Sequence, residues 1–241
     1  MQAGQLYIVA APIGNTEDIT LRALRVLKEE VALIYCEDTR HTGKLLAAHN
    51  IPSKMRSLHA HSSDERIAEA CAATLAGKNI AYLTDAGTPG LSDPGSRLVA
   101  QARSAGIRVV PLPGPSALTA LVSVSGFSEK NVLFAGFLSK KPGKRIHELE
   151  KLREFQGIIV LYESPHRVQK LLAAINEVFP ENQLIIGREM SKRFEEFITG
   201  TASELSQKTD SITEKGEFSL AIYNPKPPKL LRISSEELRQ K

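Results

Sequence analysis

The distribution of short apolar runs is the feature that most constrains the fold of this chain. Four runs rich in aliphatic and β-branched residues lie in the first half, namely LYIVA (6–10), VALIYC (31–36), IAYLT (80–84) and RVVPL (108–112). Runs that are apolar throughout, rather than at alternate positions, are typical of parallel strands covered on both faces. The pattern therefore predicts an α/β fold.

A second set of strand-like runs follows a proline-rich break after the first set. It consists of NVLFAGF (131–137), GIIVLY (157–162), QLIIGRE (183–189) and FSLAIY (218–223). A chain of 241 residues is long enough for two domains, each with its own core. We therefore predict an N-terminal α/β domain over residues 1–115 and a C-terminal α/β domain over 116–225. The proline-rich segment 226–241 is predicted to be a tail outside the fold.

The segments between the first runs have the spacing of amphipathic helices. Thr20 precedes Leu21, Leu24 and Leu27, which share one helical face, so Thr20 is the expected N-cap. A second helix is expected over residues 63–76, where Ser62 and Glu65 have the spacing of a capping box.

The composition excludes several classes of protein. Hydrophobic residues make up 42% of the chain and charged residues 24%, as in ordinary globular proteins. The two cysteines lie within apolar or helical patterns, which indicates neither a disulfide framework nor a cysteine metal cluster. No run reaches the roughly 18 apolar residues that a membrane span needs. We therefore expect a cytoplasmic protein with no membrane association.

Three loops that follow predicted strands are rich in glycine and proline: APIGN (11–15), DAGTPGLSDPG (85–95) and PGPSA (113–117). Ligands in α/β proteins bind at the carboxyl ends of strands. These loops match neither the dinucleotide nor the P-loop pattern and contain no lysine or arginine, so a polyphosphate is disfavoured. Carbonyl, hydroxyl and carboxylate groups suit a ligand with hydroxyls and positive charge, such as S-adenosylmethionine. The alternative is that the glycines and prolines only form tight turns.

Longer motifs resemble the tetrapyrrole methylase superfamily of S-adenosylmethionine-dependent methyltransferases, and within it the ribosomal RNA small subunit methyltransferase I branch. The resemblance covers roughly residues 5–223. It is carried by LYIVAAPIGNTEDITLRAL (6–24), CEDTRHTGKLL (36–46), DAGTPGLSDPG, VVPLPGPSALTAL (109–121), FAGFL (134–138) and YESPHR (162–167). Relatives that act on small molecules carry Gly-Asp-Pro where this chain has Gly87–Pro89, and Asp85 is the expected substitute for that aspartate.

The resemblance implies a homodimer of two-domain α/β chains that binds S-adenosylmethionine in the cleft between the domains. It implies methyl transfer to the ribose 2′-hydroxyl of a cytidine in the decoding region of 16S ribosomal RNA, within the small ribosomal subunit. Carried over by motif, the cofactor contacts are Ile13, Gly87, Thr88, Leu91, Ser116, Ala117, Tyr162 and Ala221.

A ribose hydroxyl is a weak nucleophile until a nearby base takes its proton. The motifs leave several candidates open, chiefly Glu37, His41, Asp85, Asp93 and Glu163, with Asp38 and His166 beside them. For Asp38 and its neighbours the alternative role is helix capping.

Six cations are candidates for contacts with RNA phosphates. Arg40 and Arg167 lie in two of the motifs, and Lys140, Lys141, Lys144 and Arg145 crowd the segment KKPGKR after a predicted strand. The alternative for this segment is a solvated loop. Lys192, in GREMSKR, is expected either to line the cleft or to be solvated.

Metal binding is not expected, because His59 and His61 form a pair with no evident third ligand. Two other functional classes stay open at this point: a methyltransferase acting on a small tetrapyrrole precursor, and a binding module that retains the cleft without catalysis.

Overall fold

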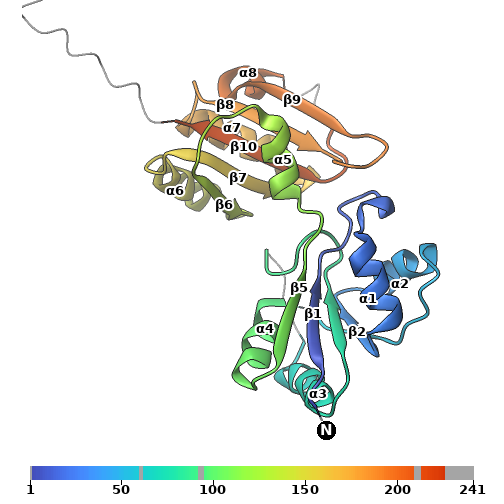
Figure 1. Cartoon of the computed structure of the whole chain (residues 1–241). Helices are drawn as coiled ribbons and strands as arrows, with labels where there is room; N and C mark the ends of the chain where they lie inside the picture. Colours follow the sequence, from blue (N-terminus) through green and yellow to red (C-terminus); the bar gives the residue numbers. More distant parts are fainter. Residues whose placement is uncertain (1, 60–61, 92–94, 209–212, 226–241) are drawn as a thin grey trace, which may run out of the picture.

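The computed structural model describes residues 2–59, 62–91, 95–208 and 213–225. These residues form two lobes, each built on a five-stranded sheet with helices packed against it (Figure 1). The predicted α/β fold is confirmed. The segment predicted to be a tail, 226–241, lies outside the described residues.

The N-terminal lobe contains a parallel sheet with the strand order β3-β2-β4-β1-β5. Its strands are β1 (Gln5–Val9), β2 (Leu33–Cys36), β3 (Met55–Ser57), β4 (Ile80–Leu83) and β5 (Arg108–Leu112). The order changes direction around β1 and β4, so their carboxyl ends form the crevice in which α/β proteins bind ligands. These ends face the C-terminal lobe (Figure 1).

Both faces of this sheet are covered by helices. On one face, α1 (Leu21–Glu29) and α2 (Thr39–Ala48) bury Leu27 and Leu46 against Ile34 and Leu83. On the other face, α3 (Asp64–Leu75) and α4 (Gly95–Ser104) pack against the sheet around Tyr35 and Tyr82. A short 3₁₀ turn, η1 (Thr16–Asp18), precedes α1. Double coverage explains why β1, β2 and β4 are almost wholly apolar.

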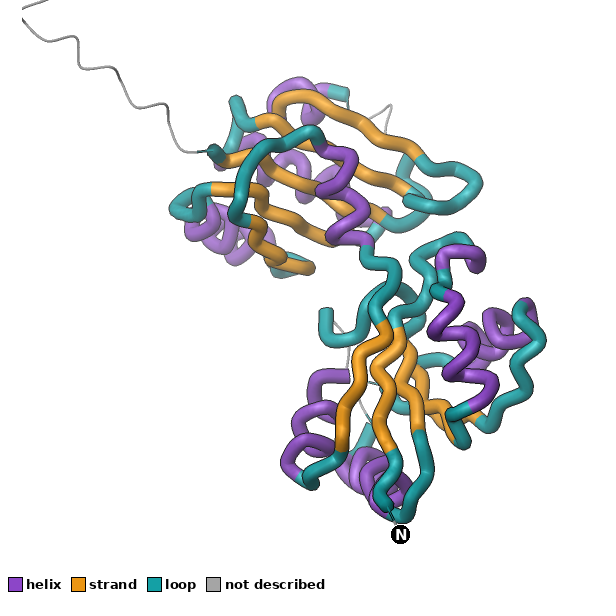
Figure 2. The backbone as a smooth tube through the Cα atoms, in the orientation of Figure 1, coloured by secondary structure: helices purple, strands orange, loops and turns teal. Residues whose placement is uncertain are grey.

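The C-terminal lobe contains a mixed sheet with the order β6-β7-β10-β8-β9. Its strands are β6 (Val132–Gly136), β7 (Gly157–Glu163), β8 (Gln183–Arg188), β9 (Glu196–Thr201) and β10 (Phe218–Asn224). Only β6 and β7 are parallel, and the other neighbours are antiparallel. By this strand order the last strand, β10, lies in the middle of the sheet, between β7 and β8 (Figure 1). Figure 2 shows the strands of this sheet in orange, with helices in purple packed against them.

The two faces of the second sheet are covered by different numbers of helices. One face packs against α6 (Pro142–Leu152), α7 (Val168–Val178) and α8 (Ala202–Gln207), with a 3₁₀ turn, η2 (Pro165–Arg167), before α7. The other face packs against the single helix α5 (Ala117–Ser125), whose Leu121 is fully buried beside Ile185 and Ala221. The chain passes from the first sheet to the second between β5 and α5. The division at residues 115 and 116 falls in this connection and stays a prediction.

Local signals at the helix ends were partly correct. Thr20 caps α1 as predicted, because its Oγ1 accepts the N–H of Ala23 at 3.2 Å. The capping box at Ser62 was wrong. The N-cap of α3 is Ser63, and Ser62 Oγ instead accepts the N–H of His59 at 2.9 Å. Within the described ranges, no helix has both the length and the apolar character needed to cross a bilayer.

Candidate active site

The three glycine- and proline-rich loops meet at the carboxyl ends of β1, β4 and β5. Ala11 and Gly87 exchange two backbone hydrogen bonds, of 2.9 and 3.0 Å, which join the first loop to the second. The hydroxyl of Thr88 donates to the carbonyl of Pro115 at 3.0 Å and joins the second loop to the third. The backbone of Gly87 is left-handed, with a φ of +76° that favours glycine. These contacts hold the loops as one surface.

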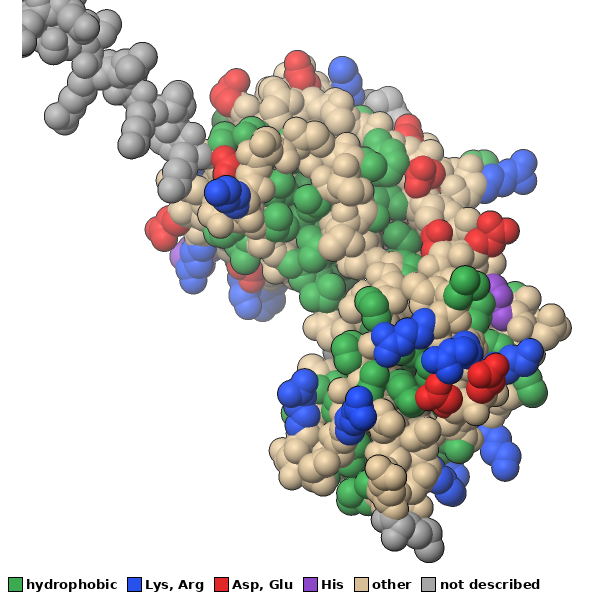
Figure 3. Space-filling model, viewed as in Figure 1, with side chains coloured by type: hydrophobic (Ala, Val, Ile, Leu, Met, Phe, Trp, Pro, Cys, Tyr) green, Lys and Arg blue, Asp and Glu red, His purple; other side chains and the backbone are tan. Residues whose placement is uncertain are grey.

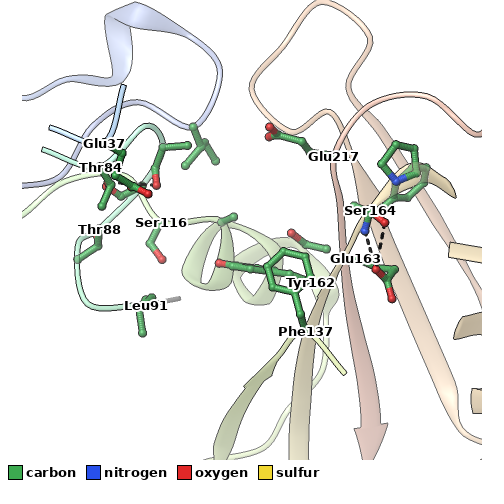
Figure 4. Close-up of a pocket in the computed structure, with 17 residues that line it drawn as sticks. Glu37, Thr84, Thr88, Leu91, Ser116, Phe137, Tyr162, Glu163, Ser164 and Glu217 are labelled. Atoms are coloured by element: carbon green, nitrogen blue, oxygen red, sulfur yellow. Dashed lines mark hydrogen bonds between the residues drawn. The ribbon is translucent and has the colours of Figure 1, made fainter. Parts of the chain in front are cut away.

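That surface forms one wall of a cavity of about 380 Å³ between the lobes. In Figure 4, Glu37, Thr84, Thr88 and Leu91 of the N-terminal lobe face Tyr162 and Glu217 of the C-terminal lobe. The cavity brings together most of the side chains predicted to contact a cofactor, namely Ile13, Gly87, Thr88, Leu91, Ser116, Ala117 and Tyr162. Their role as cofactor contacts stays a prediction.

Ala221 is the member of that predicted set that does not line the cavity. It is fully buried in β10, in the cluster of side chains beneath α5. The cavity is instead lined by residues at the start of the same strand. A direct side-chain contact between Ala221 and a ligand in this cavity is therefore not available.

Tyr162, at the end of β7, forms the aromatic part of the C-terminal wall. Its ring makes edge contacts with Phe134 and Phe137, at centroid distances of 4.8 and 5.9 Å. Burial raises the pKa of its phenol above the ordinary value, although hydrogen bonds with the backbone of Leu118 and the side chain of Ser116 oppose the shift. The phenol stays protonated at neutral pH and is available as a hydrogen-bond donor.

Several lining residues were not predicted. Ser164 and Pro165 lie within the YESPHR motif and Phe137 within FAGFL, so the motifs themselves could have indicated them. Nothing in the sequence indicated the segment 217–219. It reaches the cavity because antiparallel pairing places Phe218 opposite Glu163 and Ser219 opposite Tyr162.

The candidate bases occupy different surroundings. Glu37 lines the cavity, and its Oε1 accepts the N–H of Asp85 at 3.3 Å; in return the Oδ1 of Asp85 accepts the N–H of Asp38 at 3.1 Å. Asp85 and His41 line an adjoining cavity rather than this one. Asp93 lies outside the described residues.

Glu163 has a largely structural environment. Its side chain is fully buried, Oε2 lies 3.0 Å from Nη2 of Arg167, and Oε1 accepts the N–H of Ser164 at 2.8 Å. Figure 4 shows Glu163 holding Ser164 at the edge of the cavity. We therefore assign Glu163 to positioning this wall rather than to proton transfer.

Two of the predicted RNA-contacting cations are corrected by the structure. Arg145 is only 5% exposed, because it lies on the inner face of α6 with Leu149 one turn later. Arg167 points inward, where it pairs with Glu163 and donates to the carbonyl of Leu138 at 2.8 Å. Neither guanidinium presents itself to an RNA backbone.

The other predicted cations lie on the surface, and Figure 3 shows that lysine and arginine side chains are spread over the visible face of both lobes. Lys140, Lys141 and Lys144 are exposed at and before the start of α6. Arg40 is exposed and forms an ion pair with Asp38 at 2.8 Å. Asp38 also caps α2 by accepting the N–H of Arg40, which is the alternative role that the sequence left open for it. Hydrogen bonds from the side chain and backbone of Arg40 hold the pKa of Asp38 well below its ordinary value.

The part of the chain that the structure describes contains no group of three or more His, Cys, Asp or Glu side chains suited to holding a metal ion. His61 lies outside this part.

Comparisons with known proteins agree on one family. The sequence profile of the Tetrapyrrole (Corrin/Porphyrin) Methylases matches residues 5–206. A protein of Leptospira biflexa serovar Patoc named ribosomal RNA small subunit methyltransferase I is 45% identical over 226 residues, covering 93% of this chain and 93% of that protein. A protein of the same name from Borrelia garinii is 46% identical, covering 90% of this chain and 97% of that protein.

Solved structures share the fold at lower sequence identity. Uroporphyrin-III C-methyltransferase of Thermus thermophilus, crystallised with S-adenosyl homocysteine, has a TM-score of 0.64 at 18% identity, covering 90% of this chain and 97% of that one. A cobalt precorrin-4 methyltransferase has a TM-score of 0.68 at 16% identity, with 90% and 94% covered. The chain therefore belongs to the tetrapyrrole methylase family, in the group of the ribosomal RNA small subunit methyltransferase I proteins.

Proposed function

We propose that this protein is an S-adenosylmethionine-dependent methyltransferase that modifies the ribose 2′-hydroxyl of a cytidine in the decoding region of 16S ribosomal RNA. The observation that carries the proposal is the cavity between the lobes, whose walls come from loops of both sheets. The names of the curated relatives support the choice of ribosomal RNA over other methyl acceptors.

The chemistry of the cavity fits the proposed cofactor. Three carboxylates line it, those of Glu37, Glu163 and Glu217, and none of the described lining residues is a lysine, arginine or histidine. Glu163 is paired with Arg167 and Glu217 with Lys192, so the carboxylate of Glu37 is the main feature of this wall that favours a positively charged ligand. Hydroxyls of Thr88, Ser116, Ser164 and Ser219 supply hydrogen bonds for polar groups of the same ligand. S-adenosylmethionine combines a sulfonium, an ammonium and ribose hydroxyls.

The reaction requires positioning more than bond activation by the protein. S-adenosylmethionine supplies a methyl group already activated by its sulfonium. The linked loops around Gly87 and Thr88 fix one side of the cavity, and the aromatic wall at Tyr162 fixes the other. Holding two reactants in line can lower the activation barrier by about 7–11 kcal/mol. Among the candidate bases we favour Asp85, because it lies at the edge of the site and is not buried in an ion pair.

We also propose where the RNA lies and how the protein is assembled. The exposed lysines at and before the start of α6 follow Phe137, which lines the cavity, so they are placed to hold RNA near it. We propose a homodimer that acts in the cytoplasm, where small ribosomal subunits are found; light scattering on the purified protein measures the assembly.

The activity is tested with methyl-labelled S-adenosylmethionine and two acceptors. Small ribosomal subunits from a strain that lacks this modification serve as one acceptor, and a uroporphyrinogen-type tetrapyrrole serves as the other. We expect label in the subunits, released by nucleoside digestion as 2′-O-methylcytidine. Label on a base, or preferential labelling of the tetrapyrrole, would refute the proposal. No transfer to either acceptor would favour a non-catalytic binding module.

The fold alone supports methyltransferase activity on a small tetrapyrrole as the second candidate. The solved structures with tetrapyrrole substrates in their names match nearly the whole chain, but at 16–21% identity they are evidence for the fold and not for the substrate.

A further inference from the structure

A second cavity, of about 480 Å³, adjoins the first. The two cavities share Ile13, Thr84, Ala86 and Glu217 in their linings. Its volume falls within the roughly 300–1,000 Å³ of small-molecule sites. A ligand in the second cavity would therefore lie directly beside a cofactor in the first.

The charges that line the two cavities differ. The second cavity is lined by His41, Lys44 and Lys192 together with Asp85 and Glu217, whereas the described lining of the first contains no cation. A nucleotide needs both kinds of group, because its phosphates attract cations and its hydroxyl and amino groups donate to carboxylates. The lining of the second cavity thus matches a nucleotide better than it matches an apolar or purely cationic ligand.

Lys192 is the most firmly held of these cations. Its Nζ lies 2.9 Å from Oε1 of Glu189 and 3.1 Å from Oε2 of Glu217. Burial opposes the charge of Lys192, but the hydrogen bonds with these two glutamates outweigh it and raise the pKa above the ordinary value. Lys192 is therefore a permanent cation at neutral pH and does not serve as a base.

The backbone around Lys192 is fixed against the other lobe. A Cβ at Gly14 would collide with Cγ of Lys192, and the N–H of Asn15 donates to Oγ of Ser191 at 3.2 Å. Glu189 and Ser191 both have left-handed backbones, with φ of +50° and +62°. Strained residues of this kind persist where surrounding contacts hold them, and they cluster at functional sites. Lys192 thus reaches from the C-terminal lobe over the first loop of the N-terminal lobe.

We propose that the second cavity is the acceptor site and that Lys192 binds the phosphodiester of the target nucleotide there. The proposal rests on the function proposed above, since it places the acceptor beside the cofactor cavity. Asp85 lines the acceptor cavity but not the cofactor cavity, whereas Glu37 lines the cofactor cavity but not the acceptor cavity. Glu217 lines both and is 74% exposed, so it has room to turn into solvent when a phosphate replaces it on Lys192.

Three variants test this assignment. Lys192→Met removes the charge but keeps the unbranched stem that packs on Gly14, and Lys192→Arg restores the charge. Lys130→Met is the matched control, because Lys130 is exposed next to the amino end of β6, away from both cavities. Each protein is assayed for methyl transfer to small ribosomal subunits over a range of salt concentrations, for S-adenosylmethionine affinity by calorimetry, and for folding by thermal unfolding.

We expect Lys192→Met to raise the KM for subunits about tenfold and to flatten the salt dependence of binding by about 0.7–0.9 units of slope, the effect of one lost phosphate contact. Cofactor affinity should stay within about twofold of the parent. Lys192→Arg should recover most of the loss, and Lys130→Met should match the parent.

The outcomes separate this inference from the function on which it rests. If the parent protein transfers no methyl group to subunits, the proposed function fails and the acceptor assignment falls with it. If the parent is active and Lys192→Met keeps the parental KM and salt slope, only the acceptor assignment is overturned. A folded Lys192→Met that loses cofactor affinity as strongly as subunit affinity also overturns it, because Lys192 would then support the cofactor cavity.

Discussion

Gly87 and Gly90 provide a matched pair for testing the location of the cofactor. Both have left-handed backbones, with φ of +76° and +97°, so a leucine at either position costs about 1–2 kcal/mol in backbone strain. A protein of this kind has a stability of about 5–15 kcal/mol, so both variants should fold. Only Gly87 lines the cavity between the lobes.

The surroundings of the two glycines set the size of the expected difference. A Cβ at Gly87 would lie 3.5 Å from Cγ2 of Ile13 and 3.8 Å from the carbonyl oxygen of Pro115, whereas a Cβ at Gly90 meets nothing within 4 Å. The rest of a leucine side chain at Gly87 must therefore occupy space in the cavity that a bound cofactor would need. Overpacking of this kind costs about 1–3 kcal/mol, which corresponds to a roughly 5- to 140-fold loss of affinity.

The assay is calorimetric titration of Gly87→Leu, Gly90→Leu and the parent with S-adenosylmethionine, with thermal unfolding as the control for folding. We expect similar losses of stability in the two variants and a loss of cofactor affinity in Gly87→Leu alone. Parental affinity in a folded Gly87→Leu would refute the location of the cofactor. Equal losses of affinity in both variants would refute it too, because backbone strain rather than occupancy would then be the cause.

Three further predictions concern the charged groups. Glu163→Gln leaves Arg167 buried without its counter-charge and should lower the free energy of unfolding, measured in urea, by about 3–5 kcal/mol. The control is Glu196→Gln, at the partly exposed pair with Arg188, which should lower the free energy of unfolding by less than about 1 kcal/mol. Equal losses in the two variants would contradict the role given to burial. Because the pKa of Asp38 is depressed in the folded state, its contribution to stability should be present above the unfolded value of about 3.9 and lost as the pH falls through the lower folded value. The stability difference between the parent and Asp38→Asn, measured by denaturation at a series of pH values, should therefore shrink in acid, and a difference that stays constant down to pH 2 would argue against it. Replacing Lys140, Lys141 and Lys144 with alanine should weaken subunit binding and flatten its salt dependence by about two units while leaving cofactor affinity unchanged; an unchanged salt slope would show that these lysines do not contact RNA.

The sequence predicted those parts of the fold that depend on local pattern. β1, β4 and β7 are mostly buried, so each appears as a continuous apolar run. β3 and β9 were missed because neither contains a continuous apolar run. The run MRS is too short and too polar to stand out, and EFITGT is interrupted by a glycine.

The candidate site was predictable where its residues follow strands in glycine- and proline-rich loops. Glu217 and Ser219 were not, because they reach the cavity only through the antiparallel register of β10 with β7, which no local pattern encodes. Arg145 illustrates the opposite error. Charge alone indicated an exposed residue, but the helical period of α6 places it on the buried face with Leu149.

The central position of β10 has a consequence for how this protein folds during synthesis. The strands of the first sheet are all complete once Leu112 has been made, so the N-terminal lobe can form while translation continues. The second sheet cannot, because residues 218–224 separate β7 from β8 and supply the hydrogen bonds to both. Until then, the parallel pair of β6 and β7, connected by α6, is not joined to the antiparallel pair of β8 and β9, and the unpaired edges of both are prone to mispairing. A nascent chain arrested before residue 218 should therefore be protected from protease in its first lobe and open to cleavage throughout its second.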